Sequence, residues 1–380
     1  MSRTFARRLA LWFLGVSIAT PALAQSGGIS IPDSMFQPIR LPETGAFGYP
    51  PNETYLPRFI ELIRKRQFDS LDTIYDGLEA DVQRDVRNER RFDDAFDATD
   101  RNEPALLTAL DAWVAAKPRS AHARVARARY HYAAAWRRRG NAYIKDTPPE
   151  RLKAMAESAE AAMRDVVAGL ILDSTHLVAH EIGIGVFRLA SAHDRAFQLM
   201  VHGVTVHPGS YVLPAAFASM LWPRWGGSEE VLKEFGERAA GDSAKNPRLA
   251  TLRGVVYENR ANDSSLARNY AGAVRELNKA LAFGPETRYL RARGIAYYRL
   301  QAYEYAFHDL RTAMIERSQD REVLDYYGST LVELASRARP GIRPTILSRA
   351  SEVLRLAVYL DPLNDHARAA LDRATSMSGQ

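Results

Sequence analysis

Small and apolar side chains recur at fixed intervals in the last third of the chain, and this pattern constrains the fold most. Steps of four and three residues keep side chains on one face of an α-helix, and small residues there let two helices approach closely. A proline or polar residue five positions later ends the helix. The pattern therefore predicts stacked helix pairs. Its three sets are Ala273, Leu277, Ala280 and Pro285; Ala306, Leu310, Ala313 and Ser318; and Ala350, Leu354, Ala357 and Pro362.

A glycine precedes each set, and Gly294 and Gly328 are 34 residues apart. This arrangement resembles the tetratricopeptide repeat, a 34-residue helix–turn–helix unit that must stack with at least two others to bury its apolar face. The middle unit, 287–320, fits without a gap. The flanking units carry extra residues at 261–270 and 337–347, which should lengthen helices or form loops. We expect a capping helix at the C-terminal end, over 363–377.

The same intervals can be traced less regularly through the first half of the chain. Amphipathic segments predict early helices at 58–66, 68–84 and 90–99, and no segment alternates as a half-buried strand would. We therefore predict an all-α fold after residue 57, a right-handed α-solenoid of about seven tetratricopeptide-like helical hairpins that is irregular in its first half.

A second resemblance covers about residues 85–245. It rests on the stretch RRFDDAFDATDRNEPALLTALDAWVAAKP, on WRRRG at 136–140, and above all on PRWGGS at 223–228. These strings are similar to a bacterial domain family of unknown function that is related to tetratricopeptide repeats and often precedes them. The resemblance implies architecture rather than an activity. We expect an irregular helical domain over 58–246 and repeats over 247–380.

The N-terminal residues predict export. A cationic start is followed by a 12-residue apolar run and by small residues ahead of Gln25. As a helix this run would rise only about 18 Å, short of the roughly 30 Å hydrocarbon core of a membrane. We expect a cleaved signal peptide over 1–24 and a periplasmic or secreted protein, with retention as an anchor as the alternative. Six prolines then predict a linker or strap over 25–57.

Charge and cysteine content exclude several function classes. Without Arg3, Arg7 and Arg8 of the signal segment, 48 basic side chains face 45 acidic ones, so the charge does not point to nucleic acid. The absence of cysteine excludes disulfides, thiolate metal sites and cysteine nucleophiles. No phosphate-binding loop of the Walker type and no serine nucleophile elbow is present. We expect no cofactor and no catalysis.

A basic block over 241–300, with 11 basic and 5 acidic residues, predicts a binding surface. The resemblance implies that the first helix of each unit lines a concave groove. Arginine guanidiniums bind carboxylates through bidentate hydrogen bonds. An acidic peptide or a free C-terminus would suit this groove. The alternative is that these arginines pair with neighbouring acids such as Glu258 and Glu322. The groove candidates are Arg248, Arg253, Asn259, Arg288, Arg291, Tyr298 and Arg299.

Five of the nine histidines lie within 32 residues, and His176 and His180 stand four apart beside Glu181. This spacing can place two imidazoles on one side of a metal ion, although the glutamate lies outside the pair and the protease motif is absent. By repeat register His180 occupies a helix-packing position. We therefore treat these two histidines as weak metal candidates only.

The PRWGGS string is the last candidate site. Two glycines free the backbone, and the following serine can cap a helix. Arg224 beside exposed amides could hold an anion, whereas the structural interpretation is a tight loop whose tryptophans fill a seam between hairpins. The motif-loop residues are Trp222, Arg224, Trp225, Gly226, Gly227 and Ser228.

These observations favour an exported, non-catalytic repeat protein that binds a protein or peptide through its concave face. Two alternatives remain open at this point. The histidine cluster could serve a periplasmic metal-dependent hydrolase. The proline-rich strap could tether the protein to envelope components.

Overall fold

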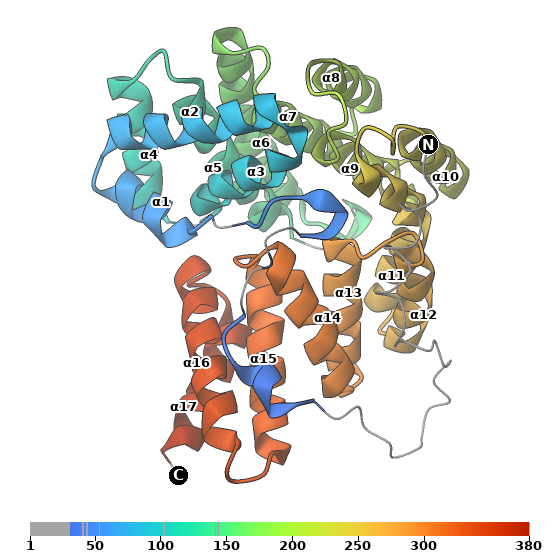
Figure 1. Ribbon diagram of the computed structural model, residues 1–380. Helices are drawn as coiled ribbons and strands as arrows, with labels where there is room; N and C mark the ends of the chain where they lie inside the picture. Colours follow the sequence, from blue (N-terminus) through green and yellow to red (C-terminus); the bar gives the residue numbers. More distant parts are fainter. Residues whose placement is uncertain are drawn as a thin grey trace, which may run out of the picture. The chain divides into compact units, whose positions relative to one another are not determined.

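A computed structural model describes residues 31–39, 42, 45–52, 54–101, 103–140, 142 and 144–379. Residues 32–380 form one compact unit, to which helices from both predicted regions, 58–246 and 247–380, belong. All regular secondary structure in the described part is helical (Figure 1). The predicted all-α fold, an α-solenoid of helical hairpins, is confirmed. The predicted signal peptide, 1–24, lies outside the described residues.

Four helices open the array, and the first shows why they form. Its apolar residues recur at steps of three and four, and Leu56, Phe59, Ile60 and Ile63 are all buried. The helix ends where Arg66 takes a positive φ of 54°. The helices are α1 (Leu56–Arg64), α2 (Phe68–Arg84), α3 (Glu89–Phe96) and α4 (Pro104–Ala116).

The middle of the chain forms six helices, and side chains cap several of their N-termini. The Ser120 hydroxyl accepts a hydrogen bond from the backbone N–H of Ala123, and Ser228 accepts one from Val231, as expected for N-caps. The helices are α5 (Ala121–Arg139), α6 (Pro149–Leu172), α7 (Leu177–Leu189), α8 (His193–Val206), α9 (Val212–Ala218) and α10 (Glu229–Ala240).

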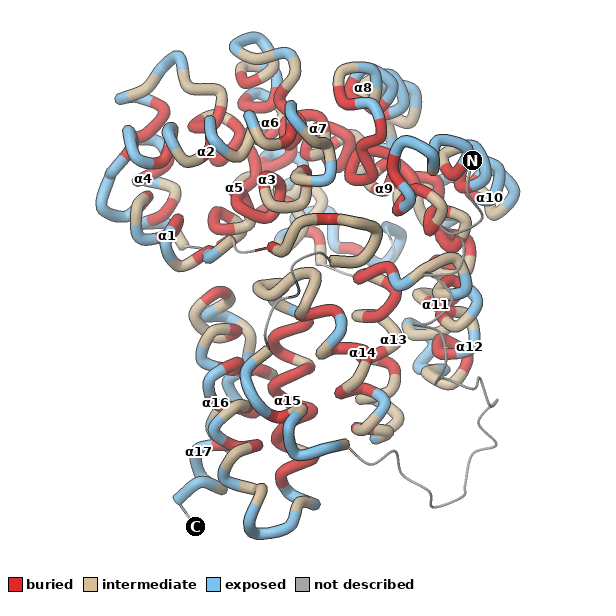
Figure 2. Tube along the Cα trace, in the orientation of Figure 1, coloured by how far each residue is buried: buried red, intermediate tan, exposed pale blue. Residues whose placement is uncertain are grey.

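The interval pattern places its small and apolar residues where helices meet. Every alanine and leucine of the three sets is buried, and Figure 2 shows buried residues recurring along the C-terminal helices. Extra residues near 337–347 lengthen two helices rather than forming a long loop. The helices are α11 (Val255–Leu266), α12 (Tyr270–Leu281), α13 (Thr287–Arg299), α14 (Tyr303–Glu316), α15 (Arg321–Arg337), α16 (Arg343–Leu360) and the cap α17 (Asp365–Ser378).

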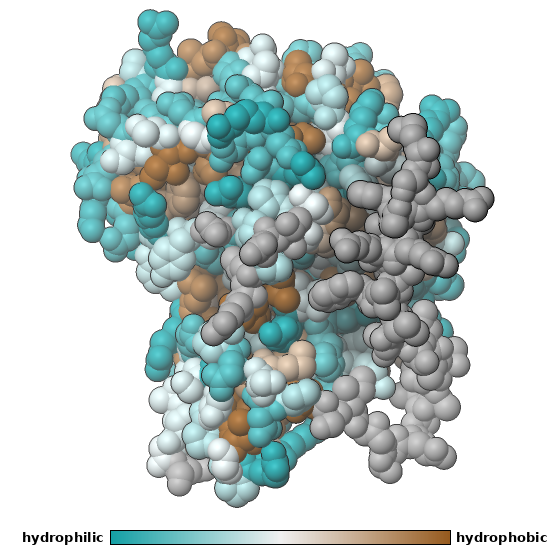
Figure 3. All heavy atoms as spheres, viewed as in Figure 1, coloured by the Kyte–Doolittle hydropathy of each residue, from teal (hydrophilic) through white to brown (hydrophobic). Residues whose placement is uncertain are grey.

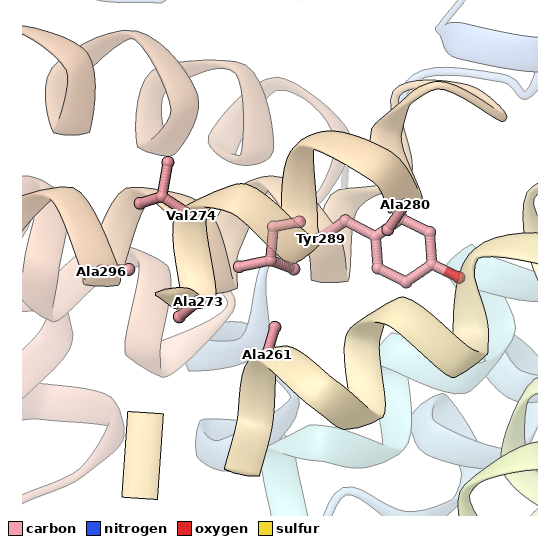
Figure 4. Packing of buried hydrophobic residues seen from close by; sticks show 7 residues of the cluster. Ala261, Ala273, Val274, Ala280, Tyr289 and Ala296 are labelled. Atoms are coloured by element: carbon pink, nitrogen blue, oxygen red, sulfur yellow. The ribbon is translucent and has the colours of Figure 1, made fainter. Parts of the chain in front are cut away.

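Figure 4 shows one such contact between α11, α12 and α13. Ala261 and Ala273 are buried between these helices, and the ring of Tyr289 lies beside Ala280. The Tyr289 hydroxyl donates to the backbone carbonyl of Thr251 at 2.9 Å, which satisfies the polar end of a fully buried ring. Small residues thus leave room for one large ring.

Short 3-10 helices connect the α-helices. One of them lies in the predicted strap and carries Phe36, and two others follow α2 and α3. They are η1 (Asp33–Phe36), η2 (Ala46–Gly48), η3 (Val86–Asn88), η4 (Asp97–Thr99), η5 (Ile144–Asp146), η6 (Ser219–Leu221), η7 (Pro223–Trp225) and η8 (Pro247–Gly254). No helix in the described ranges is long and apolar enough to span a membrane.

The described part of the predicted strap packs on the helices. The rings of Phe36 and Phe307 lie with centroids 5.3 Å apart. Tyr49 is only 3% exposed, and its hydroxyl donates to the Glu89 carboxylate at 2.7 Å while accepting from the Asn246 amide at 2.8 Å. The strap therefore contributes buried side chains to the core.

Ion pairs join the beginning of the array to its C-terminal helices. Arg317, after α14, donates to Asp94 on α3 and to Asp97 of η4, the latter at 2.9 Å. Arg321 pairs with Asp100 at 2.8 Å. These partners lie more than 200 residues apart in the sequence, so this junction is a tertiary contact rather than a repeat-to-neighbour contact.

The close approach of α15 and α16 gives a stability prediction. A Cβ added at Gly328 would lie 2.5 Å from Cγ of the buried Leu354, so Gly328→Ala should lower the free energy of unfolding by about 1–3 kcal/mol through overpacking. The matched control is Gly77→Ala on the exposed face of α2, where nothing lies within 4 Å. That change should raise the stability by up to about 1 kcal/mol. Urea unfolding of both variants measures the difference, and equal effects would contradict the packing argument.

Candidate functional site

Arg248, the first predicted groove residue, does not line an open surface. It is 3% exposed, and its guanidinium makes two hydrogen bonds with the Glu286 carboxylate, at 2.8 and 2.9 Å. The rings of Tyr49 and Tyr211 lie 4.9 and 4.5 Å from its Cζ. Burial opposes the charge on Glu286, but Arg248 outweighs it and lowers the Glu286 pKa to about 2. The strap thus covers this arginine.

Two more of the predicted arginines have the acidic partners that the alternative interpretation named. Arg288 lies 3.2 Å from Glu258, and Arg291 lies 3.3 Å from Glu322. Asn259 on α11 is 1% exposed, so a partner cannot reach it in this structure. Arg288 and Glu258 lie in a largely buried charged layer between repeats, where an ion pair costs less than a lone charge, whereas Arg291 is partly exposed and Glu322 is exposed.

The remaining three predicted residues stand elsewhere. Arg253 pairs with Glu237 of α10 at 2.8 Å. Tyr298 and the exposed Arg299 meet at Tyr326, whose hydroxyl accepts a 2.6 Å hydrogen bond from Arg299. The seven predicted residues therefore do not share one open surface: Arg299 is exposed, whereas Arg253 and Arg291 are partly exposed and held in ion pairs.

His176 is fully buried, and both of its ring nitrogens have partners. Its Nδ1 accepts a 3.3 Å hydrogen bond from the Ala179 backbone N–H and so caps α7. The ring proton of neutral His176 is therefore on Nε2, which donates to Nδ1 of His122, 3.1 Å away. Nε2 of His122 then donates to Asp76 at 3.0 Å. Burial lowers the pKa of His176 well below its usual value, which keeps this chain of imidazoles neutral.

His180 forms a second pair. Its Nδ1 donates to the His176 carbonyl oxygen at 3.0 Å, and its Nε2 lies 2.8 Å from Nδ1 of His202. The residue packs against Gly203 on α8, the helix-packing position that the repeat register predicts. Within the described residues, no group of three or more histidine or acidic side chains is placed to hold a metal ion. The occupied nitrogens give the hydrolase alternative no support.

The predicted motif loop lies between α9 and α10. Gly226 has a φ of 92°, and a Cβ on Gly227 would lie 1.9 Å from the Leu221 carbonyl oxygen, so both positions require glycine. Ser228 caps α10, as expected. The Trp225 ring meets Trp136 of α5 edge to face, with centroids 5.5 Å apart. The loop therefore joins two helical hairpins.

A groove of about 1000 Å³ runs between α1 and the helices α14 to α16. Apolar side chains form much of its surface, and Figure 3 shows apolar atoms where the α1 region meets the end of α16. No residue predicted as a site lines it. The lining residues are Ile39, Tyr55, Pro57, Arg58, Glu61, Leu62, Lys65, Gln67, Met314, Ser318, Gln319, Leu324, Arg349, Glu352, Val353, Arg355, Leu356 and Tyr359.

The charged groups of this groove are only partly balanced. Glu61 pairs with Lys65 at 2.8 Å, and Glu352 pairs with Arg349 at 2.7 Å. Two exposed cations remain, Arg58 on α1 and Arg355 on α16; the described residues supply their guanidiniums with no ion pair and no hydrogen bond. The described lining residues therefore carry a net charge of about +2 beside an apolar surface, which suits an acidic ligand.

Sequence reasoning missed the groove because its two walls are about 290 residues apart. The amphipathic pattern of α1 does predict a helix that packs on one face, since Leu56, Phe59, Ile60 and Ile63 share that face. Nothing local indicates that the opposite face will lie beside α16. Only the tertiary contacts bring the α1 and α16 walls to one site.

Comparison with known families finds a match for the first helices. Residues 56–189 match the model of DUF4034, a domain of unknown function. This range contains the RRFDDAFDATD stretch and the WRRRG string, whereas PRWGGS lies beyond it. No curated protein matches the chain.

One solved structure, described as the crystal structure of the APC/C hetero-tetramer Cut9-Hcn1, aligns with 84% of this chain at 14% sequence identity and a TM-score of 0.35. The alignment spans 55% of that protein's chain.

The buried histidines give a pH prediction. Burial lowers the pKa of His180 to about 4, whereas the unfolded chain should protonate this side chain near pH 6.5. Below pH 6.5 the unfolded state therefore binds a proton that the folded state does not. The His180 contribution should lower the free energy of unfolding by on the order of 3 kcal/mol as the pH falls from about 6.5 to 4.

Urea unfolding at a series of pH values checks this expectation. His180→Gln should be less stable than the wild type at about pH 7.5, where the histidine is neutral in both states, because it loses packing and a hydrogen bond. It should, however, lose less stability on acidification. Parallel stability curves for the two proteins would show that His180 does not carry the effect.

Proposed function

We propose that this chain is an exported, non-catalytic repeat protein that binds an acidic segment of another protein in the groove between α1 and α16. The observation that carries the proposal is a pair of exposed guanidiniums, Arg58 and Arg355, which the described residues leave without an ion pair beside an apolar surface. Guanidinium forks bind carboxylates with two hydrogen bonds, and apolar surface supplies affinity that charge alone does not.

The chemistry of the lining residues supports binding of a peptide ligand rather than catalysis on a substrate. Among the residues described, the groove is lined by no histidine and no aspartate, and its two glutamates are both in ion pairs. A general base needs a carboxylate or imidazole that can reach the reacting group. A peptide with an apolar centre and flanking acidic residues needs only the groups that are present.

The walls of the groove are held in place without a partner. Arg64 of α1 pairs with Glu103 at 2.9 Å and donates to the Tyr359 hydroxyl at 3.4 Å. At the other end of α1, the Leu56 backbone N–H donates to the Gln319 side chain at 2.8 Å. A preformed groove loses little conformational entropy on binding, so a short segment can bind with useful affinity.

Selection of peptides from a random display library tests the groove. Peptides bound by the mature wild-type chain should be enriched in Asp and Glu, and Arg58→Glu/Arg355→Glu should weaken the best ones at least about tenfold, or about 1.4 kcal/mol. The matched control is Arg299→Ala, an exposed arginine of the originally predicted concave face, which should leave binding unchanged. Calorimetry measures the affinities. Neutral peptides, or loss of binding in Arg299→Ala alone, would contradict the assignment.

Export rests on the N-terminal sequence, and we propose a periplasmic or secreted location. When the full sequence is expressed in a bacterial host, mass spectrometry should find a soluble chain that begins at Gln25. The change Leu14→Arg, which breaks the apolar run, should leave the precursor uncleaved in the cytoplasm. An intact N-terminus on membrane-bound wild-type protein would instead favour an anchor.

A further inference from the structure

Three guanidiniums gather around two tryptophan rings at the motif loop, away from the residues of the proposed peptide groove. Cζ of Arg139, at the end of α5, lies 4.6 Å from the Trp225 ring centroid. Cζ of Arg188, at the end of α7, lies 4.7 Å from the Trp136 centroid. Arg224 of the loop adds a third contact, 5.5 Å from Trp225. Each ring thus orients an arginine through its face.

Arg139 and Arg188 have no carboxylate partner in an ion pair among the described residues. Arg139 is 5% exposed, and its Nη1 donates to the backbone carbonyls of Gly140 and Ala142 at 3.0 and 3.1 Å. Arg188 donates to the Tyr132 hydroxyl at 3.3 Å, and its Nε is buried without a partner. Neutral oxygens satisfy single N–H groups, but they do not balance a charge.

The positive charges of the cluster repel one another. Burial, together with the neighbouring charges of Arg224 and Arg188, lowers the pKa of Arg139. Glu181 interacts electrostatically with Arg188, but this carboxylate already lies 3.1 Å from Arg129. An anion brought into the cluster would therefore gain attraction from guanidiniums that the fold has already oriented and partly desolvated.

We propose that Arg139 and Arg188, with Arg224 at the rim, form a binding site for a phosphate group. A phosphate dianion carries enough charge to balance Arg139 and Arg188, and its oxygens accept the two-point hydrogen bonds that guanidiniums donate. A single carboxylate would leave one of these two charges uncompensated. The site is reachable, because Arg224 and Trp225 are only half-buried and Gly226 is exposed.

The competing explanation is that the arginines only stack on the tryptophans and hold the loop. Both explanations expect some loss of stability when an arginine is removed. They differ in ligand binding, because a purely structural stack has no affinity for phosphate. The deciding measurement is therefore the dissociation constant of phosphate, with the melting temperature in chloride as a separate readout.

Calorimetric titration of the mature chain, at constant ionic strength in chloride, uses inorganic phosphate and phosphoserine as probes and acetate as a singly charged control. The wild type should bind a phosphate probe with saturation, and acetate should not saturate. Arg188→Gln should weaken phosphate binding at least about tenfold, since a charge-assisted hydrogen bond is lost. Arg238→Gln, which removes an exposed guanidinium that pairs with Glu234 on α10, is the matched control and should bind as the wild type does.

The outcomes separate the sources of the phosphate. Tighter binding of phosphoserine than of inorganic phosphate indicates a phosphate ester, and the reverse indicates the free anion. If Arg139→Gln fails to fold because its position is buried, Arg188→Gln and Arg224→Gln still decide the matter. The proposal is overturned if neither probe saturates, or if phosphate binds Arg188→Gln and Arg238→Gln equally well. Neither outcome tests the proposed peptide groove, because the groove is lined by other residues.

Discussion

The largely buried pairing of Arg317 with Asp94 and Asp97 is the interaction on which the arrangement of this protein depends. A repeat array is otherwise held by contacts between neighbours, and such contacts leave its first and last helices independent. Arg317 instead joins α3 and η4 to the turn after α14. Removing one partner of a buried ion pair costs about 3–5 kcal/mol, because the remaining charge stays buried without compensation.

The groove between α1 and α16 is a consequence of this junction. Arg321 reinforces it through Asp100, and Arg101 does so from the other side by donating to the Tyr359 carbonyl oxygen and stacking over its ring. The two walls therefore belong to segments that no repeat unit contains. A binding site built in this way differs from the concave face of a simple solenoid, because it exists only where the two ends of the array meet.

The repeat helices could be predicted well because their determinants are local. The alanines and leucines at fixed intervals are buried at the predicted contacts, the unit at 287–320 became α13 and α14, and the cap expected over 363–377 became α17. Early helices were also placed within a few residues. The pattern works because an amphipathic helix must bury one face whatever its neighbours are.

The site could not be predicted in the same way. Repeat register could not indicate that Tyr49 of the strap would lie against Arg248 and cover the guanidinium. The pairing of Arg288 with Glu258 was foreseeable, as these residues occupy adjacent units, but no sequence rule reports which segments close a tertiary junction.

What the structure adds is a way to separate arginines that stabilise the fold from those that are available to a ligand. Arg248, Arg288, Arg291 and Arg317 are matched by acids, so their binding capacity is used within the chain. Arg58 and Arg355 are exposed, and the described residues supply them with no acidic partner. Sequence composition counts all of these residues equally, whereas an unmatched charge identifies the surface on which a partner of opposite charge gains the most.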